Sequence, residues 1–128
     1  MTQNTHVSID PTLVGTVTKI EPNFAEVLLH TTQRMAADAQ GLVHGGFVFG
    51  AADYAAMCAV NDPYVVLGAS EVRFVAPVRA GDAVVCRARV TQTKGKKQIV
   101  SVEAFVAEKR VLEGVFTTFV LDEHVLEQ

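Results

Sequence analysis

Asp53 is the residue with the clearest chemical potential, because it is a carboxylate inside the most apolar stretch of the chain. No Lys or Arg stands between Phe47 and Asn61 to pair with it, and its neighbours one helical turn away are apolar residues or glycine. Burying an unpaired carboxylate costs on the order of several kcal/mol or raises its pKa. We therefore expect Asp53 to be a general base or nucleophile lining a cleft. The alternative is a carboxylate that faces a polar pocket or caps distant backbone groups.

The motif His44-Gly45-Gly46 precedes this stretch, at the start of a predicted helix. A helix N-terminus presents unpaired backbone N–H groups and a partial positive charge. Two glycines add no Cβ, so a ligand carbonyl or oxyanion can approach the bare amides as an oxyanion hole requires. The alternative is that Gly45 and Gly46 only form a tight turn.

The spacing of the two features constrains any joint mechanism. Gly46 and Asp53 are seven residues apart, which on one helix corresponds to about 10 Å of rise. Both therefore cannot act on one carbonyl carbon. A shared reaction needs the amide from one chain and the carboxylate from another, so we expect sites shared across a dimer interface.

The residues from Gly46 to Asn61 predict the element that carries Asp53. They are apolar around nearly the whole helical wheel and rich in alanine, which favours a buried helix about four turns long. Pro63 ends it, because a proline pushes the preceding residue out of helical geometry.

The remaining segments predict strands. Two of them lie on either side of a turn and carry β-branched and apolar residues, Leu13–Ile20 and Phe24–Thr31. The segment Met35–Leu42 is short and consists largely of small residues, so we expect a loop with a helical turn there. From residue 71 onward, period-two alternation and turn residues predict four strands, which we interpret as a meander ending in Val111–Leu121.

A helix that is apolar on all sides must be enclosed, so we expect an α+β fold in which an antiparallel sheet of five or six strands wraps one central apolar helix. Residues 1–128 are expected to form a single domain, with residues 1–10 as a loose N-terminal tail. The exposed strand edges favour dimerisation.

Composition excludes several functional classes. The formal charge of −3 argues against a nucleic-acid partner. The most apolar stretch has 14 residues, Phe47 to Val60, and is too short to span a bilayer, while the first ten residues lack the pattern of a signal peptide. We therefore expect a cytoplasmic protein with no membrane partner. Cys58 and Cys86 are expected to be reduced core residues.

The stretch from His44 to Asp53 resembles the signature of the hotdog-fold acyl-CoA thioesterases of the PaaI-like, phenylacetate-pathway branch, in which an acid follows His-Gly-Gly at this distance. The stretch Val72–Asp82 is similar to the strand and P-x-x-x-G-D turn of that family. The similarity spans residues 41–121. It implies a hotdog fold, a curved sheet around the central helix, and homodimers that pair again into homotetramers.

The resemblance also implies an activity and its residues. The activity is hydrolysis of an acyl-CoA thioester, with coenzyme A as part of the substrate and no metal or further cofactor. The Gly45 amide, helped by that of Gly46, would polarise the carbonyl, and Asp53 of the partner chain would activate water or attack directly. His44 would orient the loop or the substrate, or only make a hydrogen bond inside the turn.

Two departures from the family pattern concern the substrate. Asp38 stands where relatives usually place an asparagine that positions substrate or water. Tyr54 follows the acid where a small residue is frequent, and Ser70 is the nearest hydroxyl to a position, near Leu67, where some relatives orient water.

Other candidate substrate contacts are a basic group for the phosphates of coenzyme A and an apolar group for the acyl chain. The basic candidates are Lys94, Lys96, Lys97 and Arg73, with solvated surface residues as the alternative. The apolar candidates are Phe47, Tyr54 and Met57, with a role in the core as the alternative. The scattered histidines support no metal site.

A second hypothesis is a non-catalytic protein that binds acyl-CoA or an acyl carrier, because hotdog domains also form the ligand-binding parts of lipid-responsive regulators. Those regulators generally add a DNA-binding helix-turn-helix and lack the acid on the helix. A hotdog hydratase or dehydratase is a weaker third option, because the spacing of His44 and Asp53 is not typical of that branch.

Overall fold

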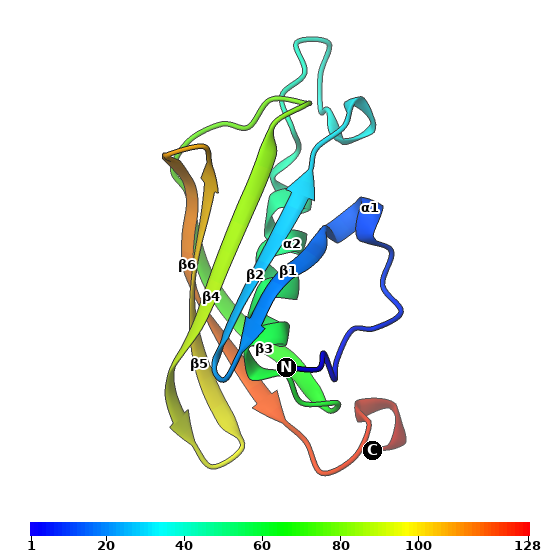
Figure 1. Ribbon diagram of the computed structural model, residues 1–128, viewed down its shortest axis with the longest axis vertical. Helices are drawn as coiled ribbons and strands as arrows, with labels where there is room; N and C mark the ends of the chain where they lie inside the picture. The colour runs from blue at the N-terminus through cyan, green and yellow to red at the C-terminus, as the bar shows by residue number, and fades with distance from the viewer.

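A computed structural model of the chain describes residues 1–128. A six-stranded antiparallel sheet curves around one long helix (Figure 1). The helices are α1 (Pro11–Val14) and α2 (Gly45–Val60), with 3-10 turns at Gln33–Met35 and Val125–Glu127. The strands are β1 (Thr16–Glu21), β2 (Phe24–His30), β3 (Val65–Phe74), β4 (Ala83–Lys94), β5 (Lys97–Val106) and β6 (Lys109–Val120). The hotdog fold is confirmed.

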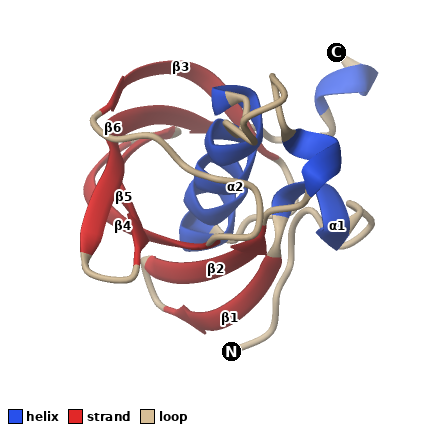
Figure 2. Cartoon of the chain, turned by 90° about the horizontal axis from the view of Figure 1, so that it is seen from above, coloured by secondary structure: helices blue, strands red, loops and turns tan.

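Helix α2 forms the centre of the hydrophobic core, and the sheet curves around it (Figure 2). Its side towards the sheet consists largely of small residues such as Ala51, Ala52 and Ala55, none of which is exposed at all. Small side chains let the sheet approach the helix closely at these positions. Cys58 and Cys86 are both free and buried, as expected, and burial raises the pKa of each thiol to about 12.

The order of strands in the sheet is β1-β2-β4-β5-β6-β3. The strands β4, β5 and β6 do form a meander, but β3 pairs with β6 and not with β4, so the prediction of a four-strand meander is wrong at its first connection. Residues 75–82 instead cross the end of the sheet (Figure 1). Neighbouring strands in sequence are usually, but not always, neighbours in space, and a turn sequence does not distinguish a hairpin from a crossing.

The first strand begins later than predicted. Residues 11–14 form the short helix α1, in which the Asp10 side chain caps the amide of Thr12 and Pro11 stands at the first helical position. Gly15 then takes a φ of 94°, a left-handed conformation that favours glycine, and the strand starts at Thr16. An Asp-Pro pair at a helix start was the overlooked signal.

The N-terminal segment is attached to α2 and is not the loose tail that we expected. Asn61, the C-terminal cap of α2, accepts the amide of Asn4 at 2.7 Å and donates to the carbonyl of Thr2 at 2.8 Å. The Gln3 side chain donates to the Tyr54 hydroxyl at 3.0 Å, and Thr5 is 5% exposed. These contacts cover the C-terminal half of the helix.

No helix in the structure is both long and apolar enough to cross a bilayer.

Candidate functional site

The start of α2 presents one free backbone amide. His44 is the N-cap, and its Nδ1 atom accepts the Gly46 amide at 2.9 Å, while the Phe47 amide donates to the His44 carbonyl at 3.1 Å. The Gly45 amide donates no hydrogen bond within the chain. His44 therefore makes the structural hydrogen bond that was one of its two expected roles, and it occupies the Gly46 amide that was expected to help the Gly45 amide.

Gly45 lines an apolar cavity of about 450 Å³ at this end of the helix. The ring of Phe74, at the end of β3, lies against Gly45. A methyl group added at Gly45 would be 3.1 Å from Cε1 of Phe74. The other residues of the wall are Leu42, Val43, Val48, Val75, Ala76, Pro77, Val78 and Val111. A cavity with apolar walls and one unpaired amide can hold a carbonyl group and strengthen its polarisation.

Asp53 lies in the middle of α2 and is half-buried. Its Oδ1 atom is buried and has no hydrogen-bond partner, and no Lys or Arg forms an ion pair with it. Burial without a partner raises the pKa of this carboxyl group to about 6. A carboxylate with such a pKa is a better general base near neutral pH than an exposed one.

Gly45 and Asp53 do not meet within one chain. They are eight residues apart on α2, a rise of roughly 12 Å. The strand β3 ends the sheet on the side where Phe74 contacts Gly45, and its outer edge has no partner strand. The free edge therefore lies beside the cavity at the start of the helix.

A second cavity of about 510 Å³ adjoins the first. It is more polar, and its wall includes Asp38, Arg79, Asp82 and Lys109. Oδ1 of Asp38 accepts the amides of Gln40 at 3.0 Å and Leu42 at 3.2 Å, so this carboxylate holds the loop before α2 in place. Asp38 thus lines the polar cavity, which adjoins the Gly45 cavity, and does not line the Gly45 cavity itself.

The three apolar candidates point to different surroundings. Phe47 lines a cleft beside α1, with its ring edge-on to His44. Tyr54 is 7% exposed beneath the N-terminal segment, and Met57 is 1% exposed in the core. None of them lines the cavity at Gly45. Tyr54 and Met57 instead belong to the hydrophobic core, which was the alternative role expected for these residues.

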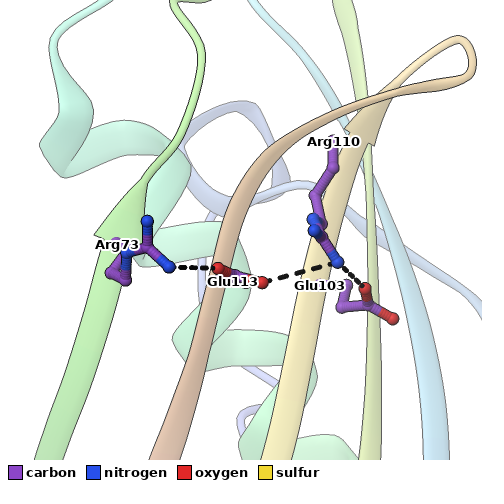
Figure 3. Close-up of polar contacts among 4 residues, drawn as sticks. All are labelled: Arg73, Glu103, Arg110 and Glu113. Carbon is purple, nitrogen blue, oxygen red and sulfur yellow. Dashed lines mark hydrogen bonds and ion pairs between the residues drawn. The ribbon is translucent and has the colours of Figure 1, made fainter.

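Ser70 and Arg73 lie on the edge strand β3. Ser70 is exposed in the middle of the strand. The Arg73 guanidinium binds Glu113 at 3.0 Å, and Arg110 joins Glu113 to Glu103 at 3.4 and 2.9 Å (Figure 3). Arg73 therefore belongs to a surface network of ion pairs.

The three candidate lysines lie far along the sheet from the cavity at Gly45. Lys94 and Lys97 flank the turn between β4 and β5, at the end of the sheet opposite the start of α2 (Figure 1). Lys96, in that turn, pairs with Asp122 at 2.6 Å.

Sequence reasoning missed Phe74, Arg79 and Lys109. Phe74 was counted only as an apolar strand position, and Arg79 only as part of a turn. The P-x-x-x-G-D turn does mark the segment that crosses beside Gly45, but only the observed crossing shows what it adjoins. No group of three or more His, Cys, Asp and Glu side chains is arranged to hold a metal ion.

Comparison with known proteins identifies the family. The thioesterase superfamily matches residues 40–113, which is more than half of the chain. The chain belongs to this superfamily. The matched residues include Gly45, Asp53 and the edge strand β3, whereas Asp38 lies just before the match.

Two solved structures show how far the likeness extends. A protein from Pyrococcus horikoshii is 51% identical, with a TM-score of 0.97, over 98% of this chain and 97% of that one. An asparagine-to-aspartate mutant of the phenylacetic acid degradation protein PaaI from Thermus thermophilus is 28% identical, with a TM-score of 0.79, over 88% of this chain and 100% of that one. The PaaI-like resemblance is confirmed.

The curated relatives are longer than this chain and carry mixed names. A protein named methylthioribose-1-phosphate isomerase from Aquifex aeolicus is 52% identical over 92% of this chain, but the match covers 26% of that protein. The transcription factor FapR from Caldanaerobacter subterraneus is 28% identical over 79% of this chain and 50% of FapR. The chain thus spans about a quarter to a half of the length of these relatives.

Proposed function

We propose that this thioesterase-superfamily protein hydrolyses an acyl-CoA thioester to a free acid and coenzyme A. The observation that carries the proposal is the half-buried Asp53 carboxyl group, which has no partner on an apolar helix. A group of this kind destabilises the fold, and a role in catalysis explains why it is present despite that cost. The free Gly45 amide at the start of the same helix supplies the second half of a thioester site.

The reaction divides between these two groups. The Gly45 N–H donates to the thioester carbonyl oxygen and holds the oxyanion that forms when water attacks the carbonyl carbon. The Asp53 carboxylate accepts a proton from that water. Collapse of the tetrahedral intermediate breaks the C–S bond, and the proton held by Asp53 passes to the departing thiolate. The acid and the thiol leave, and the carboxylate is regenerated.

The two groups come from different protomers of a homodimer in this proposal. The free edge of β3 offers unpaired backbone groups to a second copy, and Phe74 and Val75 at its end are 55% and 40% exposed. Pairing of two β3 strands around a two-fold axis makes the surfaces self-complementary. It brings the partner's helix towards the cavity at Gly45. Dimers of dimers remain part of the proposal.

The sharpest test deletes one N–H group. Pro suits the first position of a helix, and His44 already has the extended ψ of 129° that a residue before proline needs. Gly45→Pro should therefore keep α2 and lower kcat on acyl-CoA by about 10²- to 10³-fold, as loss of an oxyanion donor does. Gly45→Ala adds the same Cβ beside Phe74 but keeps the N–H, and is the matched control.

The assay is release of free thiol from short, medium and aryl acyl-CoAs by the purified protein. Substantial turnover by Gly45→Ala with loss in Gly45→Pro supports the amide as the oxyanion donor. Equal activity of the two variants contradicts it, and circular dichroism checks that both contain α2.

Hybrid dimers test the shared site. Co-expression of Asp53→Asn with Gly45→Pro should restore about a quarter of the wild-type activity, because half of the dimers are hybrids and each has one site with both native groups. If the two groups act within one chain, the mixture stays as inactive as either variant.

A non-catalytic acyl-CoA-binding protein is the second candidate. It is favoured by the similarity to the transcription factor FapR and by the His44 side chain, which occupies one of the two amides at the helix start. Calorimetric titration distinguishes the two functions. Tight binding of acyl-CoA without release of thiol would establish this candidate and exclude hydrolysis.

A further inference from the structure

We propose that Arg79 and Lys109 bind the phosphate groups of the coenzyme A portion of the ligand. This inference rests on the proposed acyl-CoA ligand, and it applies to hydrolysis and to binding alike. It assigns the anion site to the crossing segment and the β5–β6 turn, and not to the lysines at the β4–β5 turn.

The two cavities adjoin, and we interpret them as one groove. The apolar cavity that contains Gly45 and the polar cavity that contains Arg79 and Lys109 share Leu42, Pro77 and Val111 in their walls. A ligand whose carbonyl oxygen meets the Gly45 amide can therefore extend through the apolar part to the two cations. Of the two arms of an acyl-CoA, the pantetheine arm is the one that ends in phosphates.

The charges of the polar cavity favour an anionic ligand although they are balanced in number. Asp38 accepts two backbone amides, and Oδ2 of Asp82 accepts the Arg79 amide at 2.8 Å. The side chains of Arg79 and Lys109 form no ion pair or hydrogen bond with the protein. The acids are engaged by the backbone, whereas the cations are free to bind phosphate oxygens.

The backbone at Arg79 is held firmly, which positions its side chain. Its carbonyl oxygen accepts the Thr31 hydroxyl at 3.1 Å and the Asp82 amide at 2.9 Å. Lys109 is placed by β6, which begins at this residue after a tight turn. Both segments lie at the same end of the molecule as the start of α2 (Figure 1).

The other cations are poorer candidates: Arg34 lines a separate cavity beside α1, and Lys19 and Arg89 lie on the sheet over Phe24. Arg73, Arg87, Lys96 and Arg110 are paired with acids. Lys94 and Lys97 are free but lie at the far end of the sheet, so only another protomer's hairpin could bring them to this groove.

The test compares pairs of substitutions that remove the same charge. Arg79→Gln with Lys109→Gln should weaken binding of coenzyme A by about tenfold or more in calorimetry, because charge-assisted contacts are lost. The KM for acyl-CoA should rise by the same factor, with kcat unchanged. The corresponding acyl-pantetheine thioester, which lacks the phosphates, should be hydrolysed equally by variant and wild type.

Lys19→Gln with Arg89→Gln is the matched control, since both residues lie on the sheet away from either cavity. It should leave coenzyme A binding within about twofold of wild type. Lys94→Gln with Lys97→Gln tests the rival lysines, and a larger loss in that pair than in the Arg79 and Lys109 pair overturns the proposal.

The remaining outcomes separate this inference from the proposed function. Binding of coenzyme A that weakens in the Arg79 and Lys109 pair, without any hydrolysis by wild type, supports the phosphate site and rejects the hydrolase. Hydrolysis with no effect of that pair rejects the phosphate site alone. An effect confined to thioesters with a carboxylate on the acyl group, with unchanged affinity for coenzyme A, also rejects it.

Discussion

Asp53 and Glu113 are acids in opposite circumstances. Asp53 lies half-buried on the central helix with no partner, and burial raises its pKa to about 6. Glu113 lies on β6 and meets the guanidinium groups of Arg73 and Arg110 (Figure 3). The helix thus carries an acid that the fold does not satisfy, whereas the sheet carries one that has two partners.

The network around Glu113 follows one row across the sheet. Glu26, Arg87, Glu103, Glu113 and Arg73 are successive cross-strand neighbours on β2, β4, β5, β6 and β3. Arg110 bridges the two adjacent glutamates, and its hydrogen bond to Glu103 raises its pKa. Every charge in the row has an opposite neighbour, so the row needs no ligand. The difference teaches that the fold satisfies one acid and leaves the other unsatisfied, which is why we propose a function for Asp53 and not for Glu113.

The largest expected effect concerns activity. Asp53→Asn should lower kcat for acyl-CoA hydrolysis by about 10²- to 10⁴-fold, because the amide cannot accept a proton from water. Glu113→Gln makes the same chemical change in the paired acid and should leave kcat unaltered. Thiol release measures both. Equal activity of Asp53→Asn and wild type would remove Asp53 from the mechanism.

The pH dependence of stability gives a smaller effect with a definite sign. The pKa of Asp53 is raised from 3.8 to about 6 in the folded chain, so folding favours the protonated form. The free energy of unfolding should therefore fall by roughly 1 to 3 kcal/mol as the pH rises from about 4 through about 6, the lower figure allowing for solvent screening of the half-buried group.

Urea unfolding of wild type and Asp53→Asn at several pH values measures this dependence. The variant should lack the Asp53 contribution and be more stable than wild type above pH 6. The same titration should make kcat/KM of the wild type rise through about pH 6, because the base must be ionised. A variant with the same pH dependence as wild type would show that Asp53 is not the titrating group.

The smallest expected effect belongs to the surface row. A double-mutant cycle of Arg73→Gln and Glu113→Gln should give a coupling energy of about 1 kcal/mol or less, because Arg73 is largely exposed and the pair is screened. The coupling should shrink further in high salt. A coupling of several kcal/mol would mean that the row of charges contributes strongly to the stability of the fold. The row could then no longer serve as the energetically neutral counterpart of Asp53.

The sequence was sufficient for the fold class and for locating the unpaired acid and the open helix start, whose chemical roles stay a proposal. The unbroken apolar run around Asp53 predicted α2, and the structure places the helix one residue earlier at each end, at Gly45–Val60. The period-two segments predicted strands. The glycines after His44 predicted an accessible helix start, which the unpaired Gly45 amide matches.

The missed features depend on long-range contacts. The crossing of residues 75–82 placed β3 beside β6, and this brought Phe74 onto Gly45. The same crossing set Arg79 opposite Lys109, 30 positions later in the chain. In the sequence, Lys94, Lys96 and Lys97 are positive charges like Arg79 and Lys109. In the structure, they lie at the β4–β5 turn, at the other end of the molecule.

Local properties of the chain thus determined which residues are candidates for chemistry: an acid without a cation nearby in sequence, and amides without Cβ atoms at a helix start. Only the tertiary structure decided what surrounds them, including the capture of the Gly46 amide by His44 and the groove that joins Gly45 to Arg79. The physical reason is range. Helix formation and burial patterns depend on residues a few positions apart, whereas a cavity is formed by segments that meet only after the sheet has closed around the helix.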